Sequence, residues 1–347
     1  MELNLYPFDL ALRYPFAISR HTYQSMRTII VELNEGGMSG YGESTTNPYY
    51  NVTEEGLRNI FTAVGERLRE YHFTLPEKLW EDLHPVLKDH PFALSAIDCA
   101  AYDLYYKMKG KPFRNQWGIN YQKFPLTSYT LGIGTPEELI KKIRDLPWPL
   151  YKLKVAGQVD GQLLREIGGV TQALIRVDAN CAWSANQAAK IASQLEEEGV
   201  ELIEQPFQAD QYEASGTLRE NMKVPLFADE SCQGPGDLVK CMDHFDGINI
   251  KLAKCGGLTP AIRMIKMARE TGLQIMIGCM TESTVGISAA AQLLPFVDYV
   301  DLDGPLLLAE DVALGLKYAN GVVQTGNSNG LGFTYEGTKF ATSLPVS

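Results

Sequence analysis

The residues best placed to do chemistry are three lysines, at positions 152, 154 and 251. Lys152 and Lys154 alternate with the apolar Leu153 and Val155. Because side chains of a strand alternate between its two faces, a strand here points both lysines to one side. An unpaired ammonium group is costly to bury, so two lysines facing an interior indicate a site that binds anions or moves protons. A solvated edge strand is the alternative for an isolated Lys-x-Lys, since lysines usually lie at the surface.

Three acidic residues share a spacing that suits a metal site. Asp178, Glu204 and Asp229 each end a short apolar segment, and they are 26 and 25 residues apart. Three oxygen ligands without cysteine or histidine suit a hard cation such as Mg²⁺, which keeps positions open for a substrate. One such acid alone is more typical of a helix N-cap or a surface charge. Their repetition at successive strand ends favours one shared site.

Eight short apolar segments, from about residue 124 onward, alternate with helical patterns of about ten residues. We predict strands over residues 126–131, 150–155, 174–178, 202–205, 226–229, 247–251, 274–278 and 296–301. They recur at intervals of roughly 22–28 residues, which predicts an α/β fold, a (β/α)₈ barrel of the TIM type closed by parallel pairing. An open doubly wound sheet is the alternative, but no Gly-x-Gly-x-x-Gly follows the first strand.

The residues before the barrel follow a different pattern. Residues 27–44 predict a β-hairpin that turns at Gly36 and Gly37, and helical patterns follow over 54–71, 77–87 and 91–109. Strands followed by helices are typical of an α+β unit. We therefore predict an α+β capping domain over residues 1–115, completed by about 310–347, and a barrel of seven to eight βα units over residues 116–309.

Chemistry in such a barrel takes place at the C-terminal ends of its strands. Lys152 and Lys154 end the second strand and Lys251 ends the sixth, which lies opposite it in a ring of eight. A substrate carboxylate on the metal would hold its α-carbon between these amines, a layout for removing a proton from one face and returning one to the other. The enediolate formed between the two steps needs electrostatic stabilisation by the metal and Lys152. One catalytic lysine must be neutral while the other is charged, and a nearby cation lowers lysine pKa in that direction.

Asp301 and Asp303 end the eighth strand and alternate on one face. The eighth strand lies opposite the fourth, so we expect this pair far from the metal. Two carboxylates together form a cation site, and a substrate with a carboxylate at one end and an ammonium at the other would span the barrel mouth. The alternative for Asp-x-Asp in a loop is capping of a turn.

Several of these segments together resemble the muconate-lactonising subgroup of the enolase superfamily: Lys152-Leu-Lys154, Asp178-Ala-Asn180, Glu204-Gln-Pro206, Asp229-Glu-Ser231 and the run from Asn249 to Gly257. With Asp301-x-Asp303, the chain resembles that subgroup's dipeptide epimerases. The resemblance implies one Mg²⁺ per subunit on Asp178, Glu204 and Asp229. It also implies Lys154 and Lys251 as the acid/base pair, Lys152 as a carboxylate-binding residue, and the aspartate pair as the site of the dipeptide's ammonium.

The resemblance also implies further substrate contacts, at Thr130 after the first strand and at Cys279, Met280 and Thr281 after the seventh. Epimerases that act on alanyl-glutamate carry an arginine in the first capping loop, where this chain has His21, with Arg20 adjacent. We therefore predict epimerisation of L-Ala-X dipeptides in which X is alanine or another small or apolar residue.

Other functions remain open at this point. The same lysines and metal serve N-acylamino acid racemases, o-succinylbenzoate synthases and muconate-type cycloisomerases, and only Asp301 and Asp303 separate the epimerases, because the other substrates have no free ammonium. A barrel without catalysis that acts as a binding protein would lack a base or a metal ligand, and none is missing here.

The composition limits the partners and the cellular location that we expect for the protein. The chain has 347 residues and a formal net charge of −11, which argues against a nucleic-acid partner. Six cysteines without a Cys-x-x-Cys motif predict free thiols. No signal peptide and no apolar run of about 18 residues is evident. We expect a cytoplasmic enzyme with a small-molecule dipeptide substrate, no membrane partner and, by analogy with similar barrels, a homo-oligomeric state.

Overall fold

The computed structural model describes residues 1–18, 21–118, 124–157 and 161–342. Its centre is a ring of parallel strands in which each strand pairs with the next along the chain. The eight strands are β4 (Tyr129–Leu131), β5 (Leu150–Lys154), β6 (Leu174–Asp178), β7 (Leu202–Glu204), β8 (Leu226–Ala228), β9 (Gly247–Lys251), β10 (Gln274–Gly278) and β11 (Tyr299–Asp301). A bridge between Thr127 and Val300 brings the first and last strands together. The predicted barrel is confirmed, as a nearly closed ring.

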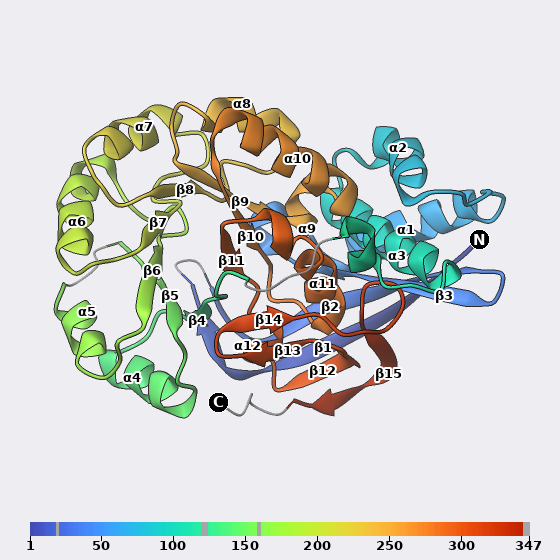
Figure 1. Ribbon diagram of the computed structural model, residues 1–347, viewed down its shortest axis with the longest axis horizontal. Helices are drawn as coiled ribbons and strands as arrows, with labels where there is room; N and C mark the ends of the chain where they lie inside the picture. Colours follow the sequence, from blue (N-terminus) through green and yellow to red (C-terminus); the bar gives the residue numbers. More distant parts are fainter. Residues whose placement is uncertain (19–20, 119–123, 158–160, 343–347) are drawn as a thin grey trace.

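Helices surround the ring on its outer side (Figure 1). They are α4 (Pro136–Asp145), α5 (Gly161–Gly168), α6 (Ala185–Glu197), α7 (Tyr212–Glu220), α8 (Leu238–Cys241), α10 (Leu258–Thr271) and α11 (Thr284–Ala291), with the single turns α9 (Leu252–Cys255) and α12 (Gly304–Leu307). Helix α4 shows why they form. Thr135 and Glu138 make a reciprocal capping box, Pro136 occupies the first turn, and Leu139 and Ile143 are buried. Amphipathic helices of this kind cover the apolar outer face of the strands.

Some strand limits differ from the prediction. The segment predicted as a strand over 296–301 begins instead at Tyr299, because a 3₁₀ turn, η4 (Leu294–Phe296), precedes it. Pro295 lies in the first turn of η4, where its fixed φ fits and its missing N–H leaves no bond unmade. A second 3₁₀ turn, η3 (Pro235–Asp237), precedes α8. Asp229 falls one residue beyond β8, at the mouth of the barrel.

The N-terminal region is an antiparallel sheet of β1 (Glu2–Ala17), β2 (Thr22–Glu35) and β3 (Met38–Thr45), covered by α1 (Glu54–Leu68), α2 (Pro76–Leu87) and α3 (Pro91–Met108). The hairpin between β2 and β3 is confirmed, and Gly36 and Gly37 both have positive φ in its turn. Strand β1 was not predicted, because Pro7 and Pro15 interrupt it. Proline is tolerated there because β1 lies at the edge of the sheet.

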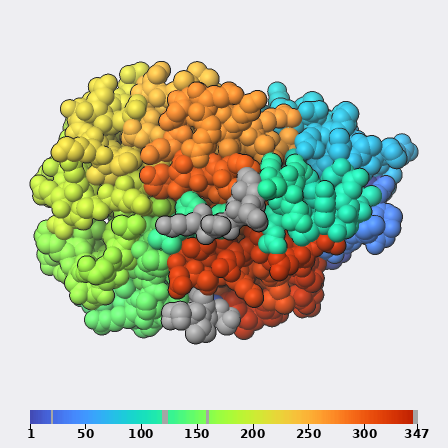
Figure 2. All heavy atoms as spheres, in the orientation of Figure 1, coloured from blue at the N-terminus to red at the C-terminus, as the bar shows by residue number. Residues whose placement is uncertain are grey.

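The C-terminal segment lies between this region and the barrel on the face shown in Figure 2. It consists of β12 (Glu310–Leu314) paired with β15 (Thr334–Ala341) and β13 (Lys317–Ala319) paired with β14 (Val322–Gln324). Arg13 on β1 donates hydrogen bonds to the Leu306 carbonyl (3.2 Å) and to the Thr342 carbonyl (2.9 Å). The predicted domain limits at residues 115 and 310 stay predictions.

Buried carboxylates join the N-terminal region to the barrel. Asp98 on α3 accepts hydrogen bonds from the Thr259 amide (2.8 Å) and hydroxyl (2.9 Å) at the start of α10. A Cβ on Gly257 would lie 2.4 Å from an Asp98 oxygen, so this close approach requires glycine. Asp103 on α3 accepts from the amides of Tyr41 on β3 and of Leu331 in the C-terminal segment. Side-chain oxygens at a helix N-terminus satisfy amide donors that would otherwise be buried without partners.

Among the described residues, none of the helices combines the length and the apolar character that a bilayer span requires.

Candidate active site

The three predicted metal acids lie together at the mouth of the barrel. Asp178 and Glu204 are register partners on β6 and β7, and Asp229 follows β8. One carboxylate oxygen from each lies within 4.8 Å of the others, and the three side chains are 0, 0 and 3% exposed. Three carboxylates that are this close together and buried from solvent are stable only when cations lie between them.

Each acid holds one oxygen in a fixed position and presents the other to the centre. The Asn180 amide donates to Asp178 Oδ1 (2.9 Å), and Asn249 Nδ2 donates to Glu204 Oε1 (2.9 Å). Lys254 Nζ lies 2.6 Å from Asp229 Oδ1. The remaining oxygens are Asp178 Oδ2, Glu204 Oε2 and Asp229 Oδ2. This donor set, three converging carboxylate oxygens without nitrogen or sulfur, fits Mg²⁺.

Three lysines contact these inward-facing oxygens. Lys152 Nζ lies 3.0 Å from Asp178 Oδ2 and 2.8 Å from Glu204 Oε2. Lys154 Nζ lies 2.5 Å from Asp178 Oδ2, and Lys251 Nζ lies 2.7 Å from Asp229 Oδ2. Lys154 ends β5 and Lys251 ends β9, with the three acid-bearing strands between them. The expected arrangement, lysines on opposite sides of one acid cluster, is therefore present.

The electrostatics of the cluster are strongly perturbed. Burial alone would lower the pKa of Lys152 and of Lys251, but the neighbouring carboxylates, with Asp178 foremost for Lys152 and Asp229 for Lys251, raise both above their usual range. Burial and the Asp178 charge raise the pKa of Glu204 to about 7.

Asp301 and Asp303 also face this centre. Asp301 Oδ2 accepts from Lys152 Nζ (2.7 Å) and Oδ1 from the Ser128 hydroxyl (2.5 Å), while Asp303 Oδ2 accepts from the Thr130 amide (2.6 Å). The expectation that this pair lies far from the metal acids is wrong for Asp301, since the Lys152 ammonium contacts Asp301 as well as Asp178 and Glu204. Lys152 on β5 is two strands from Glu204 on β7 and two strands from Asp301 on β11, and the interior of an eight-stranded barrel is narrow enough for its long side chain to reach both. Burial and the Asp301 charge raise the pKa of Asp303 to about 6.

A cavity of about 330 Å³ opens above these groups. Asp178 and Glu204 do not line it, but all the other predicted site residues do: Thr130, Lys152, Lys154, Asp229, Lys251, Cys279, Met280, Thr281, Asp301 and Asp303. His21 lines it as well, whereas Arg20 lies outside the described residues. The N-terminal region supplies the opposite wall, largely from apolar and aromatic side chains: Phe16, Ile18, Tyr23, Met26, Tyr49 and Tyr50. Tyr49 and Tyr50 belong to η1 (Pro48–Tyr50).

Sequence reasoning assigned no role to several residues that organise the site. Lys254 is fully buried, and its Nζ contacts the carbonyl oxygens of Asp229, Cys232 and Asn249 as well as Asp229 Oδ1. Gln205 Oε1 accepts from the amides of Asp229 (2.9 Å) and Ser231 (3.0 Å) and so joins the ends of β7 and β8. In the sequence, Lys254 could have been recognised because it lies within the apolar run 252–255, where an unpaired charge is unexpected.

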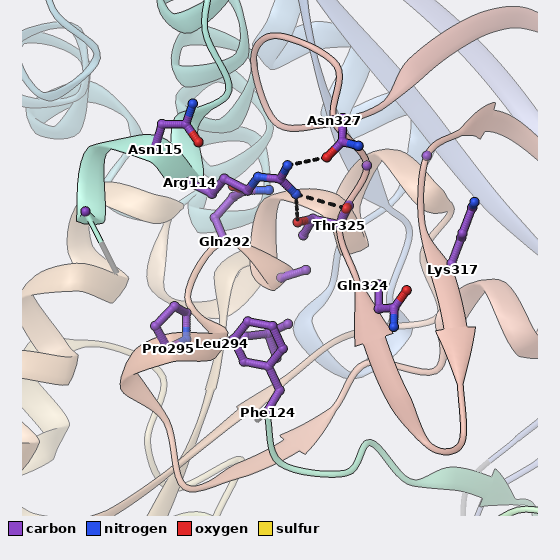
Figure 3. A pocket seen from close by; sticks show the side chains of 14 residues that line it. Arg114, Asn115, Phe124, Gln292, Leu294, Pro295, Lys317, Gln324, Thr325 and Asn327 are labelled. Atoms are coloured by element: carbon purple, nitrogen blue, oxygen red, sulfur yellow. Dashed lines mark hydrogen bonds between the residues drawn. The ribbon is translucent and has the colours of Figure 1, made fainter. Parts of the chain in front are cut away.

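A larger hollow of about 840 Å³ lies elsewhere, beside η2 (Phe113–Trp117) and the β13–β14 hairpin (Figure 3). Arg114 enters it but donates hydrogen bonds to the Thr325 carbonyl and hydroxyl (both 3.2 Å) and to Asn327. None of the predicted site residues lines this hollow. We therefore assign the chemistry to the smaller cavity at the barrel mouth.

Comparison with protein families matches both parts of the chain. Residues 2–118 match the mandelate racemase / muconate lactonizing enzyme N-terminal domain, and residues 139–339 match the enolase C-terminal domain-like family. The chain is 43% identical over 334 residues to an L-Ala-D/L-amino acid epimerase of Flavobacterium johnsoniae, covering 96% of this chain and 99% of the relative. It is 35% identical to an L-Ala-D/L-Glu epimerase of Bacteroides thetaiotaomicron, with 96% and 87% covered.

A solved structure agrees with these relatives. The dipeptide epimerase from Cytophaga hutchinsonii, complexed with Mg and the dipeptide D-Ala-L-Val, superposes with a TM-score of 0.90 and 26% identity over 96% of this chain and 95% of that one. The resemblance stated from the sequence is confirmed. The chain therefore belongs to the mandelate racemase and muconate lactonizing enzyme family of the enolase superfamily and, within it, to the dipeptide epimerases, which are isomerases.

Proposed function

We propose that the protein is an Mg²⁺-dependent epimerase that inverts the α-carbon of the C-terminal residue in L-Ala-X dipeptides, X being alanine or another small or apolar residue. The observation that carries the proposal is the placement of Lys154 and Lys251 on opposite sides of the acid triad, in a cavity that also holds Asp301 and Asp303. A base on each face suits inversion, and the second acid pair suits a free ammonium.

One Mg²⁺ per subunit would be held by Asp178, Glu204 and Asp229 through the oxygens that face the centre. When bound, the ion supplies positive charge to the substrate carboxylate, which carries the negative charge while the α-proton is absent. Lys152, in contact with two of these acids, is placed to add its own charge to the same carboxylate.

Two lysines then carry the proton transfer. In the neutral form, the amine of one lysine takes the α-proton and becomes an ammonium, while the ammonium on the opposite face gives its proton to the α-carbon. The site therefore returns with the same net charge and exchanged protonation states, and the reverse direction uses the same groups with their roles exchanged. This two-base 1,1-proton transfer proceeds through an enediolate.

Asp301 and Asp303 are proposed to bind the dipeptide's ammonium, together with Thr130, whose amide already holds Asp303. Residues 279–281 on the β10 loop are proposed to contact the peptide unit. The apolar side chains on the wall from the N-terminal region support a small or apolar X. His21 in place of an arginine supports the same preference, since a glutamate side chain would meet no described guanidinium in this cavity.

The other activities that share two lysines and a metal are N-acylamino acid racemisation, o-succinylbenzoate synthesis and muconate-type cycloisomerisation. They do not explain Asp301 and Asp303, two buried acids in a substrate cavity. A catalytically inactive binding protein is not supported either, because neither lysine nor any metal acid is missing.

The test is mass-spectrometric α-hydrogen exchange in D₂O, with Mg²⁺ and with EDTA, over a library of L-Ala-X dipeptides and N-succinyl amino acids. We expect Mg²⁺-dependent deuterium uptake and epimerisation at the second residue of unblocked dipeptides. Uptake with N-acylated substrates alone would overturn the assignment of the aspartate pair. Absence of uptake with every substrate would overturn the proposed activity.

A cytoplasmic location and a homo-oligomeric state complete the proposal. All six cysteines are free thiols, which is usual in a reducing compartment. Fractionation of the native host and light scattering of the purified protein test the two statements.

A further inference from the structure

Glu43 on β3 is a buried carboxylate from the N-terminal region that faces the barrel. Its exposed fraction is 4%. Oε2 accepts from the Ser283 amide (3.0 Å), the Ser283 hydroxyl (2.5 Å) and the Gly286 amide (3.0 Å). Oε1 accepts from the Thr28 hydroxyl (2.9 Å) and again from the Ser283 amide (3.1 Å). The residue thus collects the donors at the N-terminus of α11, a helix of the barrel.

The segment that Glu43 holds is the end of a substrate-cavity loop. Residues 279–281 line the cavity, and Glu282 and Ser283 follow at once. Glu282 turns back so that its Oε2 accepts from the Met280 amide (3.1 Å). A Cβ on Gly304 would lie 2.4 Å from the Glu282 carbonyl oxygen, so the loop packs directly on the backbone that follows Asp303. Only residues 279–282 connect the end of β10 to Ser283.

Glu43 also lies next to the facing wall of the cavity. Thr45 and Thr46, two and three residues further along the chain, line the cavity from the N-terminal region. Asn47 Nδ2 lies 3.6 Å from Met280 Sδ, across the junction of the two walls. Glu43 therefore lies close to the place where the two walls meet.

The charge on the two neighbouring acids agrees with this geometry. Burial and the Glu43 charge raise the pKa of Glu282 to about 8. Burial raises the pKa of Glu43 as well, but hydrogen bonds from Ser283, Thr28 and Gly286 oppose that rise, whereas Glu282 has the Met280 amide as its hydrogen-bond donor. Lys251 adds a smaller opposing influence on Glu282.

We propose that Glu43 is a positioning residue that fixes the loop of residues 279–281 against the bound dipeptide. The inference rests on the proposed function, because it takes this loop to contact the substrate. Glu43 touches neither the substrate nor the reacting atoms, so its effect is on substrate affinity and not on the proton transfer itself.

The experiment compares Glu43→Ala with Asp98→Ala. Asp98 is a matched control: it is also a buried carboxylate of the N-terminal region that accepts from donors at the N-terminus of a barrel helix, but the residue it holds, Thr259, does not line the cavity. Four quantities are measured for each variant and the parent: melting temperature, Mg²⁺ affinity by calorimetry, kcat and KM for the best dipeptide, and amide hydrogen exchange of residues 279–286 without substrate.

We expect both variants to melt at a lower temperature and to bind Mg²⁺ as the parent does. Glu43→Ala alone is expected to raise KM about tenfold, with kcat within about threefold, and to speed amide exchange at Ser283 and Gly286 about tenfold or more, as the loss of two or three hydrogen bonds implies. Asp98→Ala is expected to leave KM within about twofold.

An unchanged KM and unchanged exchange in Glu43→Ala would overturn the inference and leave Glu43 a purely structural acid. An equal rise of KM in Asp98→Ala would also overturn it, because general loosening of the interface would then be sufficient. If the parent protein turns over no dipeptide, the proposed function fails, whereas the exchange rates at residues 283 and 286 still decide whether Glu43 holds the loop.

Glu43→Gln keeps the test intact if the alanine variant does not fold. The amide oxygen still accepts from Ser283 and Gly286, and the amide nitrogen can donate to Thr28, whose hydroxyl also lies 3.2 Å from the Ser44 carbonyl. We expect KM to rise by about threefold, between the parent and the alanine variant. A KM equal to that of the parent together with parent-like exchange would count against the proposal.

Discussion

At the scale of residues, the two carboxylate oxygens of each metal acid have different partners. One oxygen of Asp178, Glu204 and Asp229 is tied to a neutral donor or to Lys254, and the other is directed to the centre, where an ammonium now lies. Groups that orient metal ligands affect metal affinity nearly as much as the ligands do. The lysines are thus of two kinds, those that face the cavity and one that is buried behind it.

The two cavity lysines at the ends of β5 and β9 give the first prediction. Lys154→Ala and Lys251→Ala should each lower epimerisation by about 10²–10⁴-fold, because each removes one of the two proton-transfer groups. Calorimetry should show that Mg²⁺ still binds. Each variant should retain the structure of the parent by circular dichroism. Parent-like turnover in both variants would refute the two-base mechanism.

The buried lysine behind the site gives the second prediction. Lys254→Met removes the anchor of Asp229 Oδ1 and takes one donor from each of three carbonyl oxygens. Mg²⁺ affinity should fall by about ten- to a hundredfold, measured by calorimetry on folded protein. Lys266→Met, on the exposed side of α10, is the control. Equal Mg²⁺ affinity in the two variants would show that Lys254 does not position the metal acids.

At the scale of elements, the N-terminal sheet and helices join the barrel through carboxylates that meet helix N-termini. Asp98 joins α3 to α10, and Glu43 joins β3 to α11, with Asp311 on β12 meeting the same end of α11 through Thr284. Leaving one such donor set unsatisfied costs about 1–3 kcal/mol. Elements far apart in the sequence therefore keep a fixed relation at the substrate cavity.

Asp98 gives a pH prediction at this scale. Burial raises its pKa to about 8 from an ordinary value of 3.8. The folded state then holds this proton more tightly than the unfolded state, so Asp98 makes the unfolding free energy fall as pH rises from 3.8 towards 8. Asparagine is isosteric with aspartate and neutral at every pH. The unfolding free energy of Asp98→Asn, measured by urea titration, should therefore fall less steeply than that of the parent between about pH 5 and 8. Identical slopes for the parent and the variant would contradict the raised pKa.

At the scale of the whole molecule, the substrate meets two separate surfaces. The barrel supplies the metal acids, the lysines and the aspartate pair, whereas the N-terminal region covers them with a wall that is mainly apolar. We therefore expect the chemistry to reside in the barrel and the choice of X to depend on this wall, which comes from a different part of the chain.

The fourth prediction concerns this choice. L-Ala-L-Ala and L-Ala-L-Phe should be epimerised with a higher kcat/KM than L-Ala-L-Glu, since a charged side chain would lose hydration against apolar groups. We expect a difference of about tenfold or more, measured by polarimetry with equal Mg²⁺. D-Ala-L-Ala serves as a control for recognition of the first residue. A strong preference for L-Ala-L-Glu would contradict the prediction. It would indicate that a residue near His21 binds the glutamate side chain.

The sequence by itself determined the barrel and the positions of the candidate reacting groups, because both follow from local spacing. Strand length, helix length and the repeat of about 25 residues are properties of each βα unit, so the ends of β6, β7 and β8 and the acids on them could be located without coordinates. The lysines at 152, 154 and 251 follow from the same count. The roles assigned to these residues stay predictions until the variants are measured.

Only the tertiary structure decided which groups meet across the ring and across the interface. The contact of Lys152 with Asp301 depends on the narrow radius of the closed barrel, and no spacing along the chain reports it. Strand β1 was hidden by its prolines, which an edge position tolerates. Glu43 and Ser283 are 240 residues apart, and Lys254 lies in a run that otherwise reads as apolar. Their partners are chosen by packing between distant elements, because buried polar groups must find donors or acceptors wherever the fold brings them.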